Sequence, residues 1–294
     1  MSGGRLEVLR AGALTTVQDL GRFGHAALGV PRSGALDQPA HRLANRLVGN
    51  SAEAATLETT LTGVAVRTTL PVVVAVTGAP APVRVDGRPA AWAGPVRLPP
   101  GAVLDVGAAT KGLRSYVAVS GGIAVPPVLG SRSTDLLSGL GPAPLGRGDA
   151  LPVGDPTGSP AHADTVVWQA PPEELVLPVL LGPRDDWFTT RAINTLATTP
   201  FHLSSRSNRI ALRMDGPALE RAVHREMPSE GMVLGAVQVP PDGKPVVFLA
   251  DCPTTGGYPV IGVVPEDRLP AAAQAVPGSP VRFMPTRQRR TPTA

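Results

Sequence analysis

The sequence predicts a mainly β protein with a few short helices. Between Leu57 and Val119, six short apolar runs are separated by turn residues, and no long helical pattern lies between them. The chain contains 33 glycines and 34 prolines, which favour tight turns between strands. Asp-Gly pairs at positions 86–87 and 242–243 are typical of β-hairpins. Together these observations favour a barrel or a sandwich.

The length of the chain predicts two domains. Single hydrophobic cores rarely grow beyond about 250–300 residues, and this chain has 294. The segment Pro152–Ala163 is rich in Pro, Gly, Ser and Asp, as domain linkers often are. We therefore predict an N-terminal β-barrel domain over residues 1–155 and a C-terminal β-barrel domain over residues 164–294.

Two helices are expected. The first covers Gln38–Val48, with Asp37 as its N-cap and a Gly-Asn stop after it. Its apolar residues fall on one face at helical spacing, and His41 and Arg42 are expected on the solvated face. The second covers Asp186–Ala197 and precedes a proline that cannot continue a helix.

Composition narrows the class of protein. The formal net charge is +4 and aromatic residues make up only 3% of the chain, with the arginines scattered rather than clustered, so no nucleic-acid surface is expected. The N-terminus has no apolar leader, and proline and glycine interrupt every apolar stretch, so no membrane span is expected. The single cysteine, Cys252, suits a reducing compartment. Histidines and cysteine lack metal-ligand spacing, and no metal site is predicted. These features favour a cytoplasmic protein.

The stretch Ser229–Pro259 carries the clearest concentration of polar groups. The alternating residues of Met232–Val239 predict one strand. An apolar run over Pro245–Ala250 predicts a second, buried strand, and it stops at Asp251. Thr254 and Thr255 follow, so a carboxylate and two hydroxyls are delivered at the end of a strand. Such a loop is either a binding site or a corner held by its own hydrogen bonds. The residues alone leave both interpretations open.

A second polar loop, Ser204–Arg209, carries two guanidinium groups. Guanidinium groups bind carboxylates in a bidentate manner, so this loop is a candidate site for an anionic ligand. The alternative is that its arginines pair with structural acids such as Asp215 or Glu220, and that Arg209 pairs with Asp251.

Seven stretches along the chain have a recognisable residue pattern: Thr15–Arg22, Gly29–Asp37, Ala44–Asn50, Leu129–Thr134, Ser207–Arg209, Ser229–Gly231 and Ala250–Pro259. Together they resemble the biotin-dependent carboxyltransferase family, also called allophanate hydrolase subunit 2 or the urea-amidolyase-related family. The resemblance runs in order along nearly the whole chain. After Asn208 and Arg209 the family usually continues with Met or Leu and a Gly, whereas this chain has Ile210 and Ala211.

The resemblance implies a β-barrel architecture with cyclophilin-like topology. Stand-alone bacterial members are similar to the C subunit of 5-oxoprolinase, which opens 5-oxoproline to glutamate with ATP. The partners implied are a kinase-inhibitor-like 5-oxoprolinase subunit and a lactam-utilisation subunit, with the ATP site on or shared with these partners. An alternative is a carboxyltransferase that moves carboxylate from carboxybiotin to urea or a related amide. Biotin would then come from another protein, because the chain has no Met-Lys-Met site. A third alternative is a regulatory partner that sequesters a kinase-inhibitor-like protein.

Candidate site residues lie in polar loops within these family-like stretches. Arg209 is expected to hold the substrate carboxylate, while Asp251 with Thr254 or Thr255 lines the amide, because opening an amide needs proton transfer. The predicted catalytic residues are Asp251, Thr254 and Thr255. The predicted substrate-binding residues are Asp19, Arg22, Ser33, Asp37, Asn208, Arg209, Glu230 and Tyr258.

Overall fold

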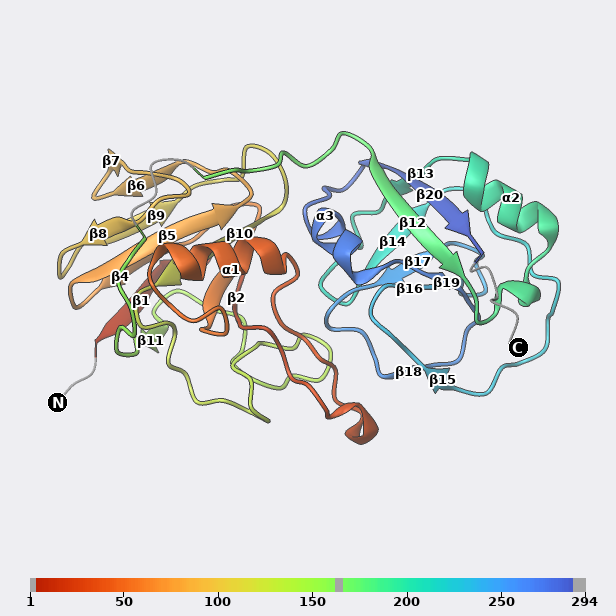
Figure 1. Cartoon of the computed structure of the whole chain (residues 1–294), viewed down its shortest axis with the longest axis horizontal. Helices are drawn as coiled ribbons and strands as arrows, with labels where there is room; N and C mark the ends of the chain where they lie inside the picture. The colour runs from red at the N-terminus through yellow and green to blue at the C-terminus, as the bar shows by residue number, and fades with distance from the viewer. Residues whose placement is uncertain (1–3, 162–165, 288–294) are drawn as a thin grey trace, which may run out of the picture. The chain divides into compact units, whose positions relative to one another are not determined.

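The computed structural model describes residues 4–161 and 166–287 (Figure 1). The chain divides into two compact units, each mainly of β-strands. The first unit contains Met1–Phe23 and Ser33–Pro171, and the second contains Gly24–Arg32 and Pro172–Ala294. Residue 164, at which the predicted second domain begins, lies outside the described residues. The mainly β fold expected from the sequence is confirmed.

Over residues 4–161 the first unit forms two antiparallel sheets. The six-stranded sheet has the order β11 (Ala150–Pro152), β1 (Arg5–Arg10), β4 (Ala65–Thr68), β9 (Val103–Val106), β6 (Val83–Val85) and β7 (Arg88–Pro89). The five-stranded sheet has the order β2 (Leu14–Gln18), β3 (Thr56–Thr60), β10 (Arg114–Val119), β5 (Val72–Gly78) and β8 (Val96–Leu98). Asp86 and Gly87 both have positive φ between β6 and β7, so the predicted hairpin is confirmed.

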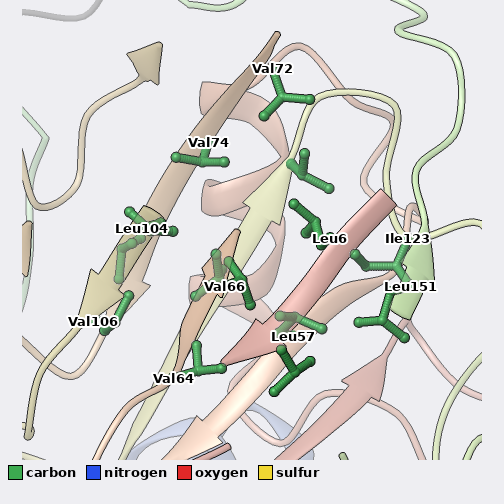
Figure 2. Close-up of a cluster of buried hydrophobic side chains, with 14 of the residues drawn as sticks. Leu6, Leu57, Val64, Val66, Val72, Val74, Leu104, Val106, Ile123 and Leu151 are labelled. Carbon is green, nitrogen blue, oxygen red and sulfur yellow. The ribbon is translucent and has the colours of Figure 1, made fainter. Parts of the chain in front are cut away.

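The main core of this unit draws its side chains from both sheets (Figure 2). Leu6 and Val66 come from the six-stranded sheet, and Leu57 and Val74 come from the five-stranded sheet. These valine and leucine side chains alternate with residues on the opposite face of each strand, as the two-residue period of a strand requires. The strand pattern allowed a barrel or a sandwich, and where we predicted an N-terminal barrel this unit has two separate sheets that share one core.

Helix α1 (Gln38–Leu47) covers the other face of the five-stranded sheet (Figure 1). Ala44 and Leu47 pack against Ala75 of β5 and Ala118 of β10, where small side chains let the helix approach closely. Both faces of β10 are therefore covered, and all its residues are buried. The carboxylate of Asp37 accepts a hydrogen bond from the backbone N–H of Ala40 at 3.1 Å, which confirms the predicted N-cap.

Over residues 166–287 the second unit contains a closed barrel. Its strands follow the order β12 (Leu175–Leu181), β19 (Val260–Val263), β16 (Ala236–Gln238), β17 (Val246–Phe248), β14 (Ala211–Asp215), β13 (Phe201–Leu203) and β20 (Pro280–Thr286). The pair β12–β20 is parallel and the other neighbours are antiparallel. A short ribbon, β15 (Glu230–Gly231) with β18 (Thr255–Gly256), forms a separate two-stranded sheet.

Short helical turns complete this unit. They are η1 (Ala26–Leu28), η2 (Asp185–Trp187), α2 (Thr190–Thr198), η3 (Glu266–Arg268) and α3 (Leu269–Ala273). Arg32 forms an ion pair with Glu266 at 2.7 Å, which joins the segment 24–32 to η3. Phe201 and Phe283 meet edge to face in the barrel core at 5.5 Å between centroids.

Two predicted element bounds in the second unit were wrong. The helix expected over Asp186–Ala197 begins only at Thr190, because Phe188 is extended and Thr189 caps the helix through a hydrogen bond from the N–H of Ala192. The strand expected over Met232–Val239 is reduced to Ala236–Gln238. Gly235 has φ +81 beside the carbonyl oxygen of Val264, where a Cβ would lie at 2.2 Å, so the backbone turns there.

Candidate functional site

Asp19 and the loop around Ser131 and Ser133 form a buried polar cluster in the first unit. Asp19 follows β2 directly, and its carboxylate accepts hydrogen bonds from the hydroxyls of Ser131 and Ser133, both at 2.6 Å. The backbone N–H groups of Arg132 and Gly21 donate to it at 2.5 and 2.8 Å. Burial opposes ionisation, but these hydrogen bonds outweigh it and hold the pKa of Asp19 below its ordinary value. Asp19 is an ionised anchor, and binding a substrate would require it to exchange one of these donors.

Arg22 and Ser33 contact the same loop. Arg22 is buried and donates hydrogen bonds from Nε to the carbonyl oxygen of Val128 at 3.1 Å and from Nη2 to that of Ser133. The Ser33 hydroxyl donates to the carbonyl oxygen of Thr134 at 3.1 Å, and Ser33 has a positive φ of 56°, which few residues other than glycine adopt. The structure thus gathers Asp19, Arg22 and Ser33 around one loop.

Asp37 belongs to a different buried network. Its backbone N–H donates to the hydroxyl of Tyr116 at 2.7 Å, and that hydroxyl donates to Glu58 at 2.8 Å. Glu58 also accepts a hydrogen bond from the N–H of Leu36 at 3.0 Å. Burial, together with the charge of Glu58, raises the pKa of Tyr116 well above its ordinary value, so the phenol stays protonated. Glu58 was not among the predicted site residues, although a charged residue inside the otherwise uncharged strand β3 was a usable signal.

His41 is buried rather than solvated, which corrects the expectation for the first helix. Its Nδ1 lies 2.9 Å from the hydroxyl of Thr56, and its Nε2 lies 3.1 Å from the carbonyl oxygen of Ala52. Burial lowers the pKa of His41 to about 4, so the ring is neutral at physiological pH. The hydrogen bonds available on this side of α1 explain why a polar ring is accepted there.

Arg209 and Asp251 form a buried ion pair in the second unit. Arg209 lies before β14 and Asp251 lies after β17, neighbouring strands of the barrel. Nε of Arg209 donates to Oδ2 of Asp251 at 3.0 Å, and Nη2 donates to Oδ1 at 3.0 Å. The two side chains are only 1% and 0% exposed. The pairing is the arrangement that the sequence left open as the alternative to substrate binding by Arg209.

The other predicted residues of these loops are held locally. The side-chain oxygen of Asn208 accepts hydrogen bonds from the N–H groups of Ile210 at 2.9 Å and Ala211 at 3.3 Å, which closes a turn. Thr254 is half-buried, and its carbonyl oxygen accepts from the N–H of Met232 at 2.9 Å. Thr255 is exposed on β18. The structure therefore keeps Asn208 and Arg209 together with Asp251, and the two threonines lead from there to the ribbon.

Glu230 sits on the ribbon and pairs with Arg184. Nε of Arg184 donates to Oε1 and Oε2 of Glu230 at 3.0 and 3.1 Å. These side chains remain 38% and 29% exposed, in contrast to the buried pair of Arg209 and Asp251. Hydrogen bonding from Arg184 lowers the pKa of Glu230. Glu230 lines a pocket of about 340 Å³ together with Arg184 and Arg225.

Tyr258 lines an adjoining pocket, also of about 340 Å³. Its ring lies beneath the guanidinium of Arg221, with Cζ 5.9 Å from the ring centroid. Both pockets are bordered by Trp187 and Arg225. Trp187, Arg221 and Arg225 were not among the predicted site residues, because only the fold brings these positions beside Tyr258.

Residues 4–161 and 166–287 bear on two questions: whether metal-binding side chains cluster, and whether a helix spans a membrane. No group of three or more His, Cys, Asp or Glu side chains has an arrangement suited to a metal ion there. None of the helices in the same ranges has the length and apolar character needed to cross a membrane.

The comparisons with known proteins decide the family. A family model described as "Carboxyltransferase domain, subdomain A and B" matches residues 28–285. The chain belongs to this carboxyltransferase domain family. It is 41% identical to the 5-oxoprolinase C subunit of Escherichia coli, covering 95% of this chain and 90% of that protein. It is 34% identical to the 5-oxoprolinase C subunit of Haemophilus influenzae, again over 95% and 90%.

A solved structure of a larger family member has the same fold. The crystal structure of the K. lactis urea amidolyase matches with a TM-score of 0.86 and 31% sequence identity. The match covers 96% of this chain but only 18% of that chain. This carboxyltransferase-family chain thus corresponds to nearly all of the two bacterial subunits and to a small part of the K. lactis enzyme.

Proposed function

We propose that this chain is the C subunit of an ATP-dependent 5-oxoprolinase, a complex that opens 5-oxoproline to glutamate. The observation that carries the proposal is the 41% identity to the Escherichia coli protein over 95% of this chain and 90% of that one. A match along nearly the whole of both chains supports a shared role more strongly than a match to one domain of a larger enzyme. The relative is named as one subunit of 5-oxoprolinase, which implies that other subunits take part.

The proposed reaction sets clear chemical requirements. Opening the lactam breaks its amide C–N bond, places the oxygen of water on the carbonyl carbon and delivers a proton to the nitrogen. Such a site needs a cation for the substrate carboxylate and groups that move protons. In this proposal the loop from Asp251 to Tyr258 faces the substrate, with the hydroxyls of Thr254 and Thr255 near the amide. The Arg209–Asp251 pair fixes the start of that loop.

Partner subunits complete the proposed enzyme. We assign ATP to a site on, or shared with, a lactam-utilisation subunit and a kinase-inhibitor-like subunit. The test is to purify this chain with those two proteins and to follow glutamate and ADP formation from 5-oxoproline. Equal stoichiometry of the two products is the expected result. ATP hydrolysis that does not depend on 5-oxoproline, with no glutamate formed, would contradict the proposal.

A second candidate function is carboxyl transfer from carboxybiotin to urea or a related amide. It is favoured by the family description and by the structural match to the K. lactis urea amidolyase. Biotin would have to be carried by another protein, because the chain has no Met-Lys-Met site. Incubation with a carboxylated biotin carrier and urea separates the two candidates. Transfer of labelled carboxylate to urea would support this function, and its absence beside active 5-oxoproline opening would exclude it.

A further inference from the structure

The pocket beside Tyr258 in the second unit has the lining of a binding site for an organic anion. We call it the arginine pocket, and define it by Trp187, Arg221, His224, Arg225 and Tyr258. Its volume of about 340 Å³ falls at the lower end of the range for small-molecule sites, roughly 300–1,000 Å³. A ligand of this size would be a single small ring with its substituents.

Two arginines of this pocket are held against aromatic rings. Cζ of Arg221 lies 5.9 Å from the ring centroid of Tyr258, and Cζ of Arg225 lies 5.6 Å from that of Trp187. Arg221 also donates a hydrogen bond from Nη2 to the carbonyl oxygen of Val239 at 2.6 Å. Stacking on an aromatic face fixes the plane of a guanidinium and leaves N–H groups at its edge available for an anion.

The charge of these two arginines is not balanced by an ion pair. Within residues 4–161 and 166–287, no carboxylate lies within ion-pair distance of Arg221 or Arg225. Arg184 nearby shows the opposite state, since Glu230 binds its guanidinium through two oxygens. Glu226 also lines the arginine pocket, so the two arginines leave an excess of positive charge. A carboxylate is the group that a guanidinium binds in a bidentate manner.

The remaining walls suit a flat, weakly polar ring. Tyr258 is 44% exposed, so much of its ring is open to a ligand. Pro241 and Pro259 add apolar surface to the lining. We propose that the arginine pocket binds a small ring bearing one carboxylate, with Arg221 and Arg225 at the carboxylate and Tyr258 against the ring. The choice of 5-oxoproline as the natural ligand rests on the proposed function, and the class of ligand rests on the pocket.

The binding test uses the purified single chain and the fluorescence of Trp187. Trp187 borders the pocket, whereas Trp92 and Trp168 contact each other at 5.6 Å in the first unit. The probes are 5-oxoproline, its neutral amide, and benzoate as an unrelated ring carboxylate. The quenching of Trp187 fluorescence should saturate with a carboxylate probe. The affinity for the neutral amide should be about tenfold or more lower. The fluorescence change should disappear in Trp187→Phe. Isothermal titration of the same pairs checks affinities independently of fluorescence.

Arg225→Gln is the decisive variant, because Arg225 is exposed and its guanidinium lies over the ring of Trp187 without an ion-pair partner among residues 4–161 and 166–287. It should weaken carboxylate binding by about tenfold or more, the scale of a lost charged hydrogen bond. Arg221→Lys, which keeps the charge and a donor but loses the planar fork, should weaken it less. Arg191→Gln, an exposed arginine of α2, is the matched control and should bind as the parent does.

The outcomes separate this inference from the proposed function. Failure of both carboxylates to bind, equal binding of acid and amide, or unchanged binding in Arg225→Gln would overturn the inference, even if the complex opens 5-oxoproline. Specific binding of the carboxylates to a chain whose complex is inactive would retain the inference and reject the proposed function. Binding of benzoate without 5-oxoproline would keep the ligand class and remove 5-oxoproline as its natural member.

Discussion

Arginine–carboxylate pairs occur in two very different settings in the second unit. The Arg209–Asp251 pair is bidentate and buried, with 1% and 0% of its side chains exposed. The Arg184–Glu230 pair is also formed through two carboxylate oxygens, but its side chains are 38% and 29% exposed. The same chemistry therefore has two consequences. A buried pair cannot lose a partner without leaving an uncompensated charge, whereas an exposed one exchanges its partner for water.

This difference bears on which arginines are available to a ligand. Arg209 sits in a family-like stretch and was predicted to hold a substrate carboxylate, but Asp251 already occupies its guanidinium. Arg221 and Arg225 lie in a stretch without such a motif, yet they border a pocket. Burial and pairing, which a sequence does not display, separate arginines that stabilise a loop from those suited to binding.

The largest expected effect is the loss of one partner from the buried pair. Arg209→Ala or Asp251→Asn should lower the free energy of unfolding by about 3–5 kcal/mol, because the remaining group stays buried without its counter-charge. Urea denaturation of the purified chain measures this loss. The double variant should be less destabilised than the sum of the single variants. A single variant with an unchanged urea midpoint and a roughly hundredfold loss of activity in the complex would instead assign the residue to the reaction.

Buried His41 in the first unit should produce a pH effect of slightly smaller size. The unfolded chain protonates this histidine below a pKa of 6.5, whereas the folded chain resists protonation down to about 4. The unfolded state therefore binds more protons between these values, and stability should fall by roughly 3 kcal/mol as the pH drops through this window. Urea midpoints at several pH values measure the slope. His41→Gln should flatten it, and an equal slope in both proteins would contradict the assignment.

The Asp19 cluster gives a third, more moderate effect. The Ser133 hydroxyl donates to the Asp19 carboxylate at 2.6 Å and accepts from the Asp19 N–H at 3.0 Å. Ser133→Ala should therefore destabilise the chain by about 1–3 kcal/mol, the effect of leaving buried polar groups with one partner fewer. Ser51→Ala, at an exposed serine whose hydroxyl accepts a hydrogen bond from the N–H of Glu53 at 3.3 Å, is the control for the loss of a solvent-exposed hydroxyl. A matching small change in both variants would argue against an anchoring role for Asp19.

The exposed pair should give the smallest effect. Arg184→Ala removes a bidentate partner from Glu230, as Arg209→Ala does from Asp251, but water replaces it. The urea midpoint is expected to stay within experimental error of the parent. The pKa of Glu230 should rise towards its ordinary value, since Arg184 is what lowers it, and NMR titration of the carboxyl group can follow this. A large loss of stability would show that exposure does not separate the two pairs.

Local signals predicted much of the fold. The Asp37 cap, the apolar runs that form β5 and β10, and the Asp-Gly turns all depend on residues a few positions apart. The contacts at the candidate site are not local. The hydroxyl of Ser131 reaches Asp19 across 112 positions, and Arg184 reaches Glu230 across 46.

These long-range contacts depend on strand order and on side-chain direction, which single-sequence patterns do not contain. The arginine pocket joins Trp187, Arg221 and Tyr258, three positions that no repeat or spacing connects. For the same reason the sequence offered Arg209 both as a ligand and as a partner of Asp251, and could not decide between them.

One measurement tests the central proposal most directly. Three preparations are assayed for ATP-dependent glutamate formation from 5-oxoproline: the complex of this chain with the lactam-utilisation and kinase-inhibitor-like proteins, those two proteins without this chain, and this chain alone. We expect turnover only in the complete complex, with a higher KM for 5-oxoproline in Arg225→Gln and an unchanged one in Arg191→Gln. Equal turnover without this chain, or turnover by this chain alone, would contradict its assignment as the C subunit.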